Sequence, residues 1–274
     1  MGKNIRFNSI FIIQLILTLI AGFLNLEFSK EKIEQHNKPD AYKYSCPLFD
    51  HFCTYQSGKW IKSGVWCNGG IFNCKWYPEQ VFFPNDESSS IMTLILDKID
   101  ENSNVKYKSG EIRSKEKYGY GLFEVRMKPV LHPGVVSSFF VYTSSCDDPG
   151  NPWEEIDIEF IKCPNGNDSC QVMQCNYFTN GIGNNEHKVS LNFDATVDYH
   201  VYAFKWEPDK ITWYIDGNIV HSVTNKNIPN HAGRIMMNLW STINADNWTG
   251  KHDGKVPLKA YYDWVRYTPL IPEN

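Results

Sequence analysis

Hydrophobic and polar residues alternate along much of the chain after its first 25 residues, which is the pattern of β-strands with one buried face. From Phe123 to Lys128, for example, apolar and charged residues follow one another in turn. Segments rich in β-branched and aromatic residues also predict strands, and the predicted strands are Ile91–Ile99, Gly121–Val130, Val135–Thr143, His200–Trp206, Arg234–Trp240 and Ala260–Tyr267. No window of twelve residues in this part of the chain has a clean helical stripe.

A β-hairpin is predicted where Ile211–Asp216 and Asn218–Val223 flank Gly217, because an Asp-Gly pair supplies the positive φ angles of a two-residue turn. Many short strands separated by turns indicate an all-β protein, built as a two-sheet sandwich or a barrel. The amino-acid composition stays uniform from about Cys46 to Thr268, and no Pro-, Ser- or Gly-rich segment interrupts it. We therefore expect a single domain over residues 46–270.

The N-terminus has a different pattern. Lys3 and Arg6 precede an apolar run of 15 residues, Ile10–Leu24, which is typical of a secretory signal peptide and shorter than the roughly 18–20 residues that span a bilayer. An uncleaved signal anchor is the alternative. We expect a signal peptide at residues 1–25, a polar linker at 26–45, and a secreted protein with no membrane contact after cleavage.

Aromatic residues make up 15% of the 274 residues, which leaves open whether the rings form the core or bind a ligand. The net charge is −4 and the pI about 6.1. This balance argues against a nucleic-acid-binding protein. Nothing in the sequence requires an oligomer, so a monomer is expected.

Eight cysteines are consistent with an oxidising compartment. Six residues separate the members of three pairs, Cys46 and Cys53, Cys67 and Cys74, and Cys163 and Cys170, and Cys146 and Cys175 are left over. These four pairings are the preferred disulfide prediction, and other connectivities stay open. A zinc site is disfavoured because no C-x-x-C pair occurs and the histidines form no ligand-spaced cluster.

The most informative segment is Trp153–Phe160, in which acidic and apolar residues alternate. A period of two puts Glu155, Asp157 and Glu159 on one face of a strand and the apolar residues between them, with Phe160, on the other. Acids side by side repel one another, a cost that commonly marks a functional site. A solvated edge strand is the alternative, but the apolar reverse face predicts a central strand.

Glycoside hydrolysis requires two carboxyl groups on one face: one attacks the anomeric carbon, and the other donates a proton to the leaving oxygen. Retaining enzymes hold these groups about 5–5.5 Å apart, whereas the Cα atoms of Glu155 and Glu159 should lie about 13 Å apart in a strand. Their side chains must therefore lean inward. Asp157 between them can hold the pair in opposite protonation states. A calcium cluster is the competing use of three acids, but calcium loops place their ligands on a turning backbone.

The acidic strand resembles the catalytic strand of glycoside hydrolase family 16, specifically of the lichenases (endo-1,3-1,4-β-glucanases). Other segments resemble the same subgroup in the same order over roughly residues 60–268; they are Asn68–Trp76, Tyr118–Pro129, Val135–Phe140, Asn176–Gly181, Lys210–Gly217, Ile235–Trp240 and Tyr262–Val265. The resemblance implies a β-jelly-roll sandwich of two antiparallel sheets with a concave cleft that binds a β-glucan polysaccharide.

The resemblance also implies roles for the three acids, with no catalytic cofactor. Glu155 is the expected nucleophile, Asp157 the assisting acid and Glu159 the general acid/base. Laminarinase-type relatives carry one extra residue in this strand as a bulge. The unbulged form found here favours a lichenase or a xyloglucan transglycosylase.

Substrate contacts follow from the same resemblance. Polar positions that match those holding glucosyl hydroxyls are Asn68, Glu111, Arg113, Asn176 and Asn238. Aromatic positions that match the cleft are Trp66, Phe140, Tyr142, Trp153, Phe178, Trp240 and Trp248. Asp263 matches a position that binds a structural Ca²⁺, so a calcium site is expected there.

The chain departs from the pattern of the bacterial lichenases at two places. Ser109 replaces the cysteine that those enzymes pair with the match of Cys74, which makes Cys67 the nearest partner for Cys74. The loop Ser145–Asn151 before the acidic strand also differs, which leaves the details of the subsites open.

Three functions are compatible with these residues. The first is a secreted, retaining endo-β-glucanase that cuts mixed-linkage 1,3-1,4-β-glucan. The second is a β-glucan or xyloglucan transglycosylase that uses the same strand. The third, a non-catalytic glucan-binding module, is disfavoured because all three acids are intact.

Overall fold

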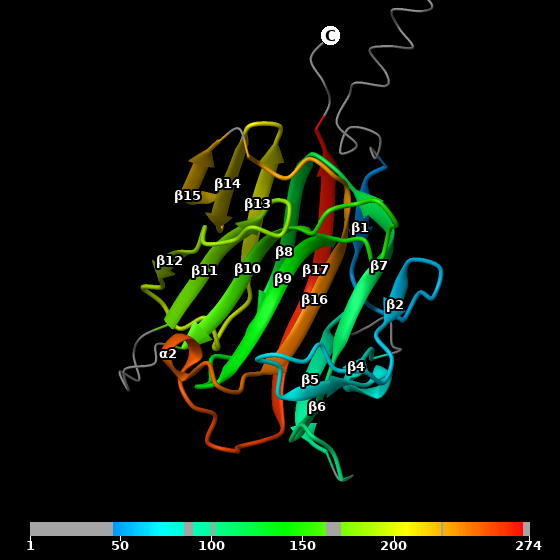
Figure 1. Cartoon of the computed structure of the whole chain (residues 1–274), viewed down its shortest axis with the longest axis vertical. Helices are drawn as coiled ribbons and strands as arrows, with labels where there is room; N and C mark the ends of the chain where they lie inside the picture. The colour runs from blue at the N-terminus through cyan, green and yellow to red at the C-terminus, as the bar shows by residue number, and fades with distance from the viewer. Residues whose placement is uncertain (1–45, 85–89, 100–101, 163–170, 226, 271–274) are drawn as a thin grey trace, which may run out of the picture. The chain divides into compact units, whose positions relative to one another are not determined.

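Two β-sheets pack face to face to form the protein (Figure 1). The computed structural model describes residues 46–84, 90–99, 102–162, 171–225 and 227–270. The predicted signal peptide and linker lie outside the described residues, as do Cys163 and Cys170. No helix in the described part of the chain is long and apolar enough to cross a membrane.

The seven-stranded sheet is antiparallel throughout and contains the acidic strand, β10, as its third strand from one edge. Its strands in spatial order are β12 (His187–Ser190), β11 (Gln171–Phe178), β10 (Glu154–Lys162), β9 (Val135–Thr143), β16 (Gly233–Ser241), β7 (Glu111–Tyr118) and β2 (Trp60–Lys62). The prediction of a central strand is therefore confirmed.

The second sheet has ten strands and lies behind the first. Eight of them follow the order β15 (Asn218–Thr224), β14 (Lys210–Ile215), β13 (His200–Glu207), β8 (Gly121–Lys128), β17 (Leu258–Pro269), β5 (Met92–Lys98), β6 (Tyr107–Ser109) and β3 (Cys74–Trp76). Two short strands complete the sheet: β1 (Leu48–Asp50) pairs with β17, and β4 (Val81–Phe82) pairs with β5. Only the β3–β6 pair is parallel among the described pairs of this sheet.

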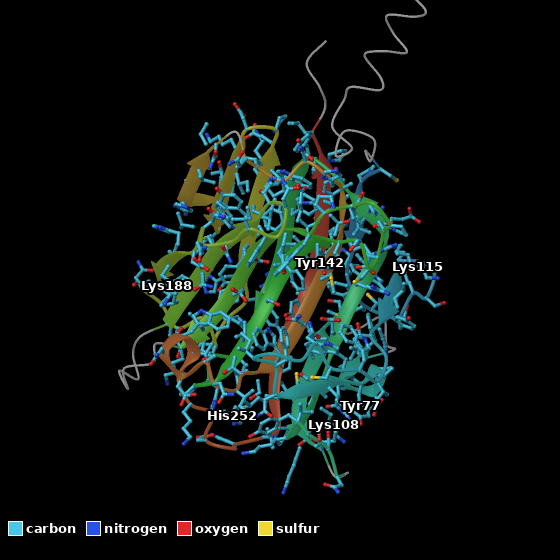
Figure 2. All side chains as sticks on the ribbon, viewed as in Figure 1. Tyr77, Lys108, Lys115, Tyr142, Lys188 and His252 are labelled. Carbon is cyan, nitrogen blue, oxygen red and sulfur yellow. The ribbon has the colours of Figure 1, made fainter. Side chains whose placement is uncertain are left out.

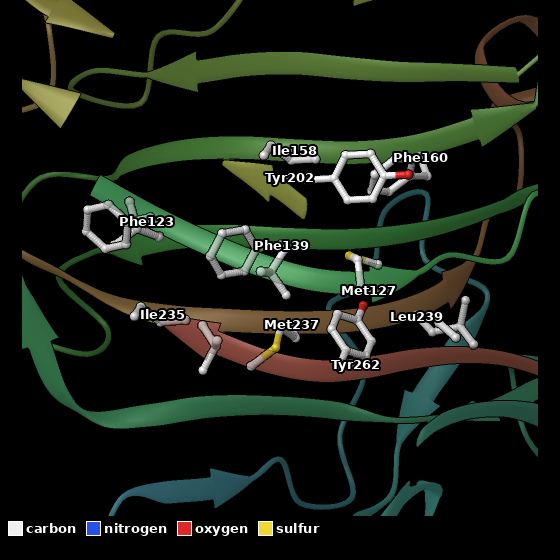
Figure 3. Packing of buried hydrophobic residues seen from close by; sticks show 14 of the residues in the cluster. Phe123, Met127, Phe139, Ile158, Phe160, Tyr202, Ile235, Met237, Leu239 and Tyr262 are labelled. Carbon is white, nitrogen blue, oxygen red and sulfur yellow. The ribbon is translucent and has the colours of Figure 1, made fainter. Parts of the chain in front are cut away.

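The core lies between the sheets and contains many of the aromatic residues. Ile156, Ile158 and Phe160 on the inner face of β10 are fully buried. The Phe160 ring meets the Tyr202 ring from the opposite sheet, with ring centroids 4.5 Å apart (Figure 3). The apolar residues of β10 thus face the core. Because side chains alternate along a strand, the acids between them must occupy the opposite face.

The predicted strands are confirmed, with ends within two residues of those expected. The hairpin of β14 and β15 turns at Asp216 and Gly217, whose φ angles are +48° and +79°, as an Asp-Gly turn requires. The described helices are only the 3₁₀ turn η2 (Pro78–Gln80) and α2 (Asp246–Thr249). The structure confirms the expected sandwich of two largely antiparallel sheets.

Candidate active site

The three acids of β10 lie on the outer face of the seven-stranded sheet, as the alternation predicted. They line a cleft of about 730 Å³ that crosses this sheet. Glu155, Asp157 and Glu159 lie opposite Phe178, Asn176 and Gln174 of β11, one pair after another. Because residues paired across antiparallel strands share a face, these β11 residues lie beside the row of acids.

The strands on the other side of β10 extend the same rows. Tyr142, Phe140 and Ser138 of β9 lie opposite the three acids in the same order. Continuing outward, Asn238 of β16 pairs with Ser138, and Glu111 of β7 pairs with Asn238. Figure 2 shows Tyr142 near the middle of the seven-stranded sheet, between Lys188 on one side and Lys115 on the other. The rows therefore extend over five neighbouring strands, and four of them, β7, β16, β9 and β10, line the cleft.

The two glutamates hold their protons more tightly than ordinary carboxyl groups. Burial raises the pKa of Glu155 to about 7, against opposing hydrogen bonds from Trp153 and Asp157. Burial and the charge of Glu155 raise the pKa of Glu159 to about 8. Near neutral pH, Glu155 is therefore the easier of the two to ionise, which suits a nucleophile beside a proton donor.

Asp157, which lies between the two glutamates on β10, is itself protonated. Burial, and then the charges of Glu155 and Glu159, raise the pKa of Asp157 well above its ordinary value. The protonated side chain donates a hydrogen bond to Glu155 and thereby favours the ionised form of Glu155. The sequence-based role of Asp157 in separating the two glutamates is consistent with this geometry.

Each glutamate also has a dedicated hydrogen-bond donor. Nε1 of Trp153 donates to Oε2 of Glu155 at 2.8 Å. Nε2 of Gln174 donates to Oε2 of Glu159 at 2.9 Å. Gln174 was not among the residues predicted from the sequence. It lies four residues before Phe178, and an even spacing in a strand places both side chains on the same face, so this spacing could have identified it.

A buried polar network occupies the far end of the cleft. Glu111 accepts hydrogen bonds from Ser63 at 2.7 Å and from Asn238 at 3.1 Å. Ser138 donates to Asn238. Burial raises the pKa of Glu111, while these hydrogen bonds lower it. The network holds the side chains of Glu111 and Asn238 in place. Both residues were predicted to bind glucosyl hydroxyls.

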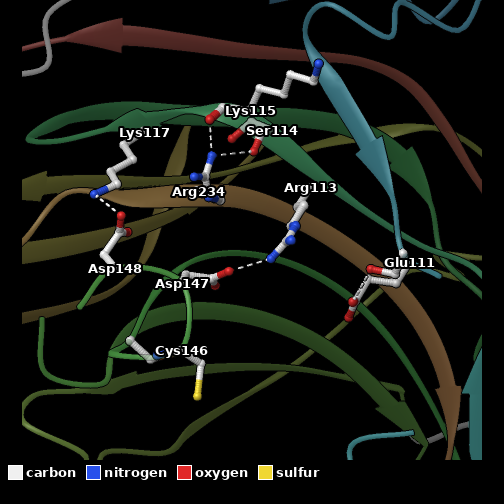
Figure 4. Close-up of polar contacts among 11 residues, drawn as sticks. Glu111, Arg113, Ser114, Lys115, Lys117, Cys146, Asp147, Asp148 and Arg234 are labelled. Carbon is white, nitrogen blue, oxygen red and sulfur yellow. Dashed lines mark hydrogen bonds and ion pairs between the residues drawn. The ribbon is translucent and has the colours of Figure 1, made fainter. Parts of the chain in front are cut away.

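Arg113 is held by the loop that precedes β10. Its Nη1 lies 2.5 Å from Oδ1 of Asp147, and the next residue, Asp148, forms an ion pair with Lys117 at 2.7 Å (Figure 4). Nε of Arg113 is buried and has no hydrogen-bond partner among the described residues. The loop therefore holds the guanidinium of Arg113 at the wall of the cleft.

The predicted cleft rings differ in exposure. Trp66 is 47% exposed and Trp153 is 43% exposed, so their faces are open to a ligand. Trp153 stacks on Phe178 with ring centroids 4.7 Å apart. Trp240, in contrast, is only 4% exposed and stacks on Phe72 at 4.0 Å. Trp240 is thus part of the packing as well as of the cleft wall.

The structure brings together the residues predicted for the site. Those that line the cleft are Trp66, Asn68, Glu111, Arg113, Phe140, Tyr142, Trp153, Glu155, Asp157, Glu159, Asn238 and Trp240. Asn176 and Phe178 lie beside them on the same face of β11, and Trp248 joins through Gln174. Further lining residues that the sequence did not suggest are Gly69, Gly70, Ile71, Phe72, Ser138, Cys146, Asp147 and Met236.

The predicted disulfides are not formed among the described cysteines. Cys46, Cys53, Cys67, Cys74, Cys146 and Cys175 all have free thiols. The pairing of Cys146 with Cys175 is wrong, because Cys175 is buried on the inner face beside Ile158 whereas Cys146 lines the cleft on the outer face. Equal sequence spacing did not account for the face on which each thiol lies. The pairing of Cys163 with Cys170 falls outside the described residues.

The calcium site expected at Asp263 does not fit the side chains found there. Asp263 forms an ion pair with Arg126 and accepts a hydrogen bond from Ser90 at 3.2 Å. The guanidinium already supplies the positive charge that a cation would bring. No group of three or more His, Cys, Asp or Glu residues within the described ranges could hold a metal ion.

Comparison with known proteins gives a consistent result. The family model "Glycosyl hydrolases family 16" matches residues 68–266. A beta-glucanase of Bacillus subtilis is 50% identical over 221 residues, covering 81% of this chain and 86% of that protein. A beta-glucanase of Brevibacillus brevis is 44% identical over 257 residues and covers 93% of each chain.

Solved structures agree with the sequence matches. A prokaryotic beta-1,3-1,4-glucanase (lichenase) derived from a mouse hindgut metagenome superposes with a TM-score of 0.75 at 43% identity, covering 82% of this chain and 99% of that one. A laminarinase catalytic domain from Thermotoga maritima has a TM-score of 0.66 at 17% identity and shares the fold.

Proposed function

Since the chain belongs to glycosyl hydrolase family 16 and is a glycoside hydrolase of the β-glucanase type, we propose that it is a retaining endo-enzyme that hydrolyses mixed-linkage 1,3-1,4-β-glucan. The observation that carries this proposal is the row Glu155, Asp157, Glu159 in a cleft that crosses four strands, β7, β16, β9 and β10. The two glutamates differ in pKa in the direction that the two roles require.

In the first step, the Glu155 carboxylate attacks the anomeric carbon and forms a glycosyl ester, while the bond from that carbon to the glycosidic oxygen breaks. Glu159 donates its proton to the departing oxygen, so the leaving chain departs as a neutral alcohol. Asp157 and Trp153 keep Glu155 ionised by donating hydrogen bonds to it.

In the second step, the ionised Glu159 accepts a proton from a water molecule, and the water oxygen attacks the anomeric carbon from the face that the first leaving group occupied. The ester bond breaks and Glu155 leaves as a carboxylate. Two inversions restore the original configuration, and both carboxyl groups return to their starting protonation states.

The choice of mixed-linkage glucan rests on two supports. The relative from the mouse hindgut metagenome is described as a beta-1,3-1,4-glucanase (lichenase) and is 43% identical over nearly its whole length. In addition, β10 pairs with β9 and β11 in unbroken register, without the bulge expected of laminarinase-type enzymes.

We also propose that the enzyme is secreted as a monomer after removal of residues 1–25. The basic and apolar pattern around Ile10–Leu24 supports export. N-terminal sequencing of protein from the culture medium and its mass by light scattering test these two statements. An intact Met1 in the exported protein, or a dimer mass, contradicts them.

A substrate panel tests the activity. Lichenan, barley β-glucan, laminarin, xyloglucan and carboxymethylcellulose are each incubated with the wild-type enzyme and with Glu155→Gln, and reducing ends are measured. We expect release from the first two substrates by the wild type alone, with retained anomeric configuration by NMR. Dominant chain transfer to an added acceptor oligosaccharide identifies a transglycosylase instead, and binding without release identifies a binding module.

A further inference from the structure

Gln174 occupies the position directly across from Glu159 on the neighbouring strand β11. It is only 2% exposed, and its Nε2 lies 2.9 Å from Oε2 of Glu159. A buried amide beside a titrating carboxyl group can either donate through its nitrogen or present its oxygen. Only the first orientation stabilises the ionised carboxylate, so the orientation of this amide matters for Glu159.

Trp248 determines that orientation. Its Nε1 lies 3.0 Å from Oε1 of Gln174. An indole N–H is a donor only, so its partner must be the amide oxygen. The amide nitrogen of Gln174 then has to face Glu159, because a flipped amide would place two donors together and the carbonyl oxygen against the carboxylate.

The backbone that carries Trp248 is firmly anchored. Thr249, the next residue, is fully buried, and its hydroxyl lies 2.7 Å from that of Thr242. The Thr249 carbonyl also accepts a hydrogen bond from the backbone of Gly134 at 2.8 Å. The Trp248 ring packs against Trp240 with centroids 5.8 Å apart. The short helix α2 therefore presents the indole N–H from a fixed place.

We propose that Trp248 and Gln174 form a positioning relay, in which the indole orients the amide and the amide orients the carboxyl group of Glu159 for proton transfer. The proposal deepens the proposed function and rests on it, because it takes Glu159 to be the general acid/base. When Glu159 gives its proton to the glycosidic oxygen, the relay supplies a preorganised N–H to the carboxylate that forms. The contact strengthens as charge develops, so it lowers the barrier and not only the energy of the ground state.

The groups around Glu159 have opposing effects on its pKa. Burial, and after it the negative charges of Glu155 and Glu186, raise the pKa of Glu159, and the hydrogen bond from Gln174 lowers it. Asp157 lies between the two glutamates on β10, and Lys188 of β12 pairs in register with Gln174. Removal of the amide donor should therefore raise the pKa of Glu159 further.

The test uses Gln174→Met, which keeps the shape of the side chain without the amide, and Trp248→Phe, which keeps a ring without the N–H. For each variant, kcat/KM is measured against pH on barley β-glucan and on a 2,4-dinitrophenyl glycoside of a glucan oligosaccharide. The dinitrophenolate group leaves without a proton, so this substrate bypasses the acid. We expect the alkaline limb of the kcat/KM profile, where Glu159 loses its proton, to move to higher pH in both variants. Turnover of β-glucan should fall about tenfold, below the full contribution of a general acid, while turnover of the aryl glycoside changes by less than about threefold.

Trp264→Phe is the control for an indole-to-phenyl change, because Trp264 lies on β17 of the other sheet, where its ring packs against Phe49. Its alkaline limb should stay at the wild-type position. Melting temperatures establish that each variant is folded. The relay is wrong if the limb stays in place in a folded Gln174→Met, or moves in that variant but not in Trp248→Phe. Failure of the proposed function looks different: the wild type then releases no reducing ends, or Glu159→Gln retains full activity on β-glucan.

Discussion

The indole nitrogen of Trp153 lies 2.8 Å from Oε2 of Glu155, two residues further along the chain. The same indole stacks on Phe178 and leaves 43% of its side chain exposed in the cleft. One side chain therefore both lines the cleft and donates a hydrogen bond to the proposed nucleophile. Binding of a glucosyl ring and ionisation of Glu155 are linked through this residue.

Trp153→Phe should preserve the stacking and remove the hydrogen bond. Because that bond lowers the pKa of Glu155, its loss raises the pKa, and Glu155 must be ionised to attack. The acid limb of kcat/KM should move to higher pH, with a larger loss of activity at pH 6 than at pH 8. A parallel drop at both pH values contradicts this role and leaves only stacking.

The wild-type enzyme should have a narrow, bell-shaped pH profile. The proposed mechanism requires Glu155 ionised and Glu159 protonated, and their pKa values are about 7 and about 8. We expect kcat/KM to rise through the lower value and fall through the higher one. A flat profile between pH 5 and 9 is the result that contradicts this assignment.

Glu155→Gln should lose several orders of magnitude of activity and gain stability at alkaline pH. In the folded protein Glu155 stays protonated up to about pH 7, whereas an unfolded glutamate ionises near its ordinary value of about 4.3. The folded state thus binds more protons between these values, and the free energy of unfolding falls as pH rises through them. We expect the variant to be about 1–3 kcal/mol more stable than the wild type at pH 8 and equal to it at pH 4.

Thermal unfolding at pH 4, 6 and 8 measures this difference, and Glu116→Gln on the exposed part of β7 is the control for loss of one acidic charge. A stability gain that is independent of pH, or that appears equally in the control, contradicts the explanation by burial.

Phe160→Ala and Trp248→Ala should separate core rings from cleft rings. Phe160 is fully buried between the sheets, so its truncation should cost about 3–5 kcal/mol of unfolding free energy. Trp248 is partly exposed, so Trp248→Ala should weaken glucan cleavage with a smaller loss of stability. The sequence suggested the same behaviour for Trp240, but its burial against Phe72 predicts that Trp240→Ala also destabilises the fold. Urea unfolding and reducing-end assays on the three variants check this ranking.

A chelator should leave the stability of the enzyme unchanged. Arg126 pairs with Asp263 where the resemblance suggested Ca²⁺, so the carboxylate needs no metal to balance its charge. We expect the enzyme to have the same melting temperature in about 5 mM EDTA as in about 5 mM CaCl₂. A fall of several degrees in EDTA contradicts this conclusion, since a degree corresponds to roughly 0.3 kcal/mol for a domain of this size.

The sequence was sufficient for the features that depend on a period of two. Alternation assigned Glu155 and Phe160 to opposite faces of one strand, and the Asp-Gly pair located the hairpin, because both follow from local backbone geometry. It could not assign contacts between residues far apart in the chain. The Gln174 amide, the Arg126–Asp263 pair and the faces of Cys146 and Cys175 depend on which strands become neighbours and in what register.

The strand β7 illustrates the same limit for secondary structure. Its second half is rich in Lys and Glu, and no strand was predicted there, yet Glu111–Tyr118 pairs with both β2 and β16. Strand propensity is weak where one face meets solvent, and pairing partners decide the outcome.

The alternation in β10 also constrains how the enzyme can evolve. From Glu155 to Phe160 the acidic positions face the cleft and the apolar positions between them face the core. A single-residue insertion or deletion within this segment would therefore turn the acids on one side of it inward and the isoleucines outward, unless a bulge absorbed it. A library of such insertions should therefore lose soluble expression and activity together, whereas two-residue insertions retain the pattern of faces. New specificities are more accessible through the loop that carries Asp147, where length can vary without inverting a strand.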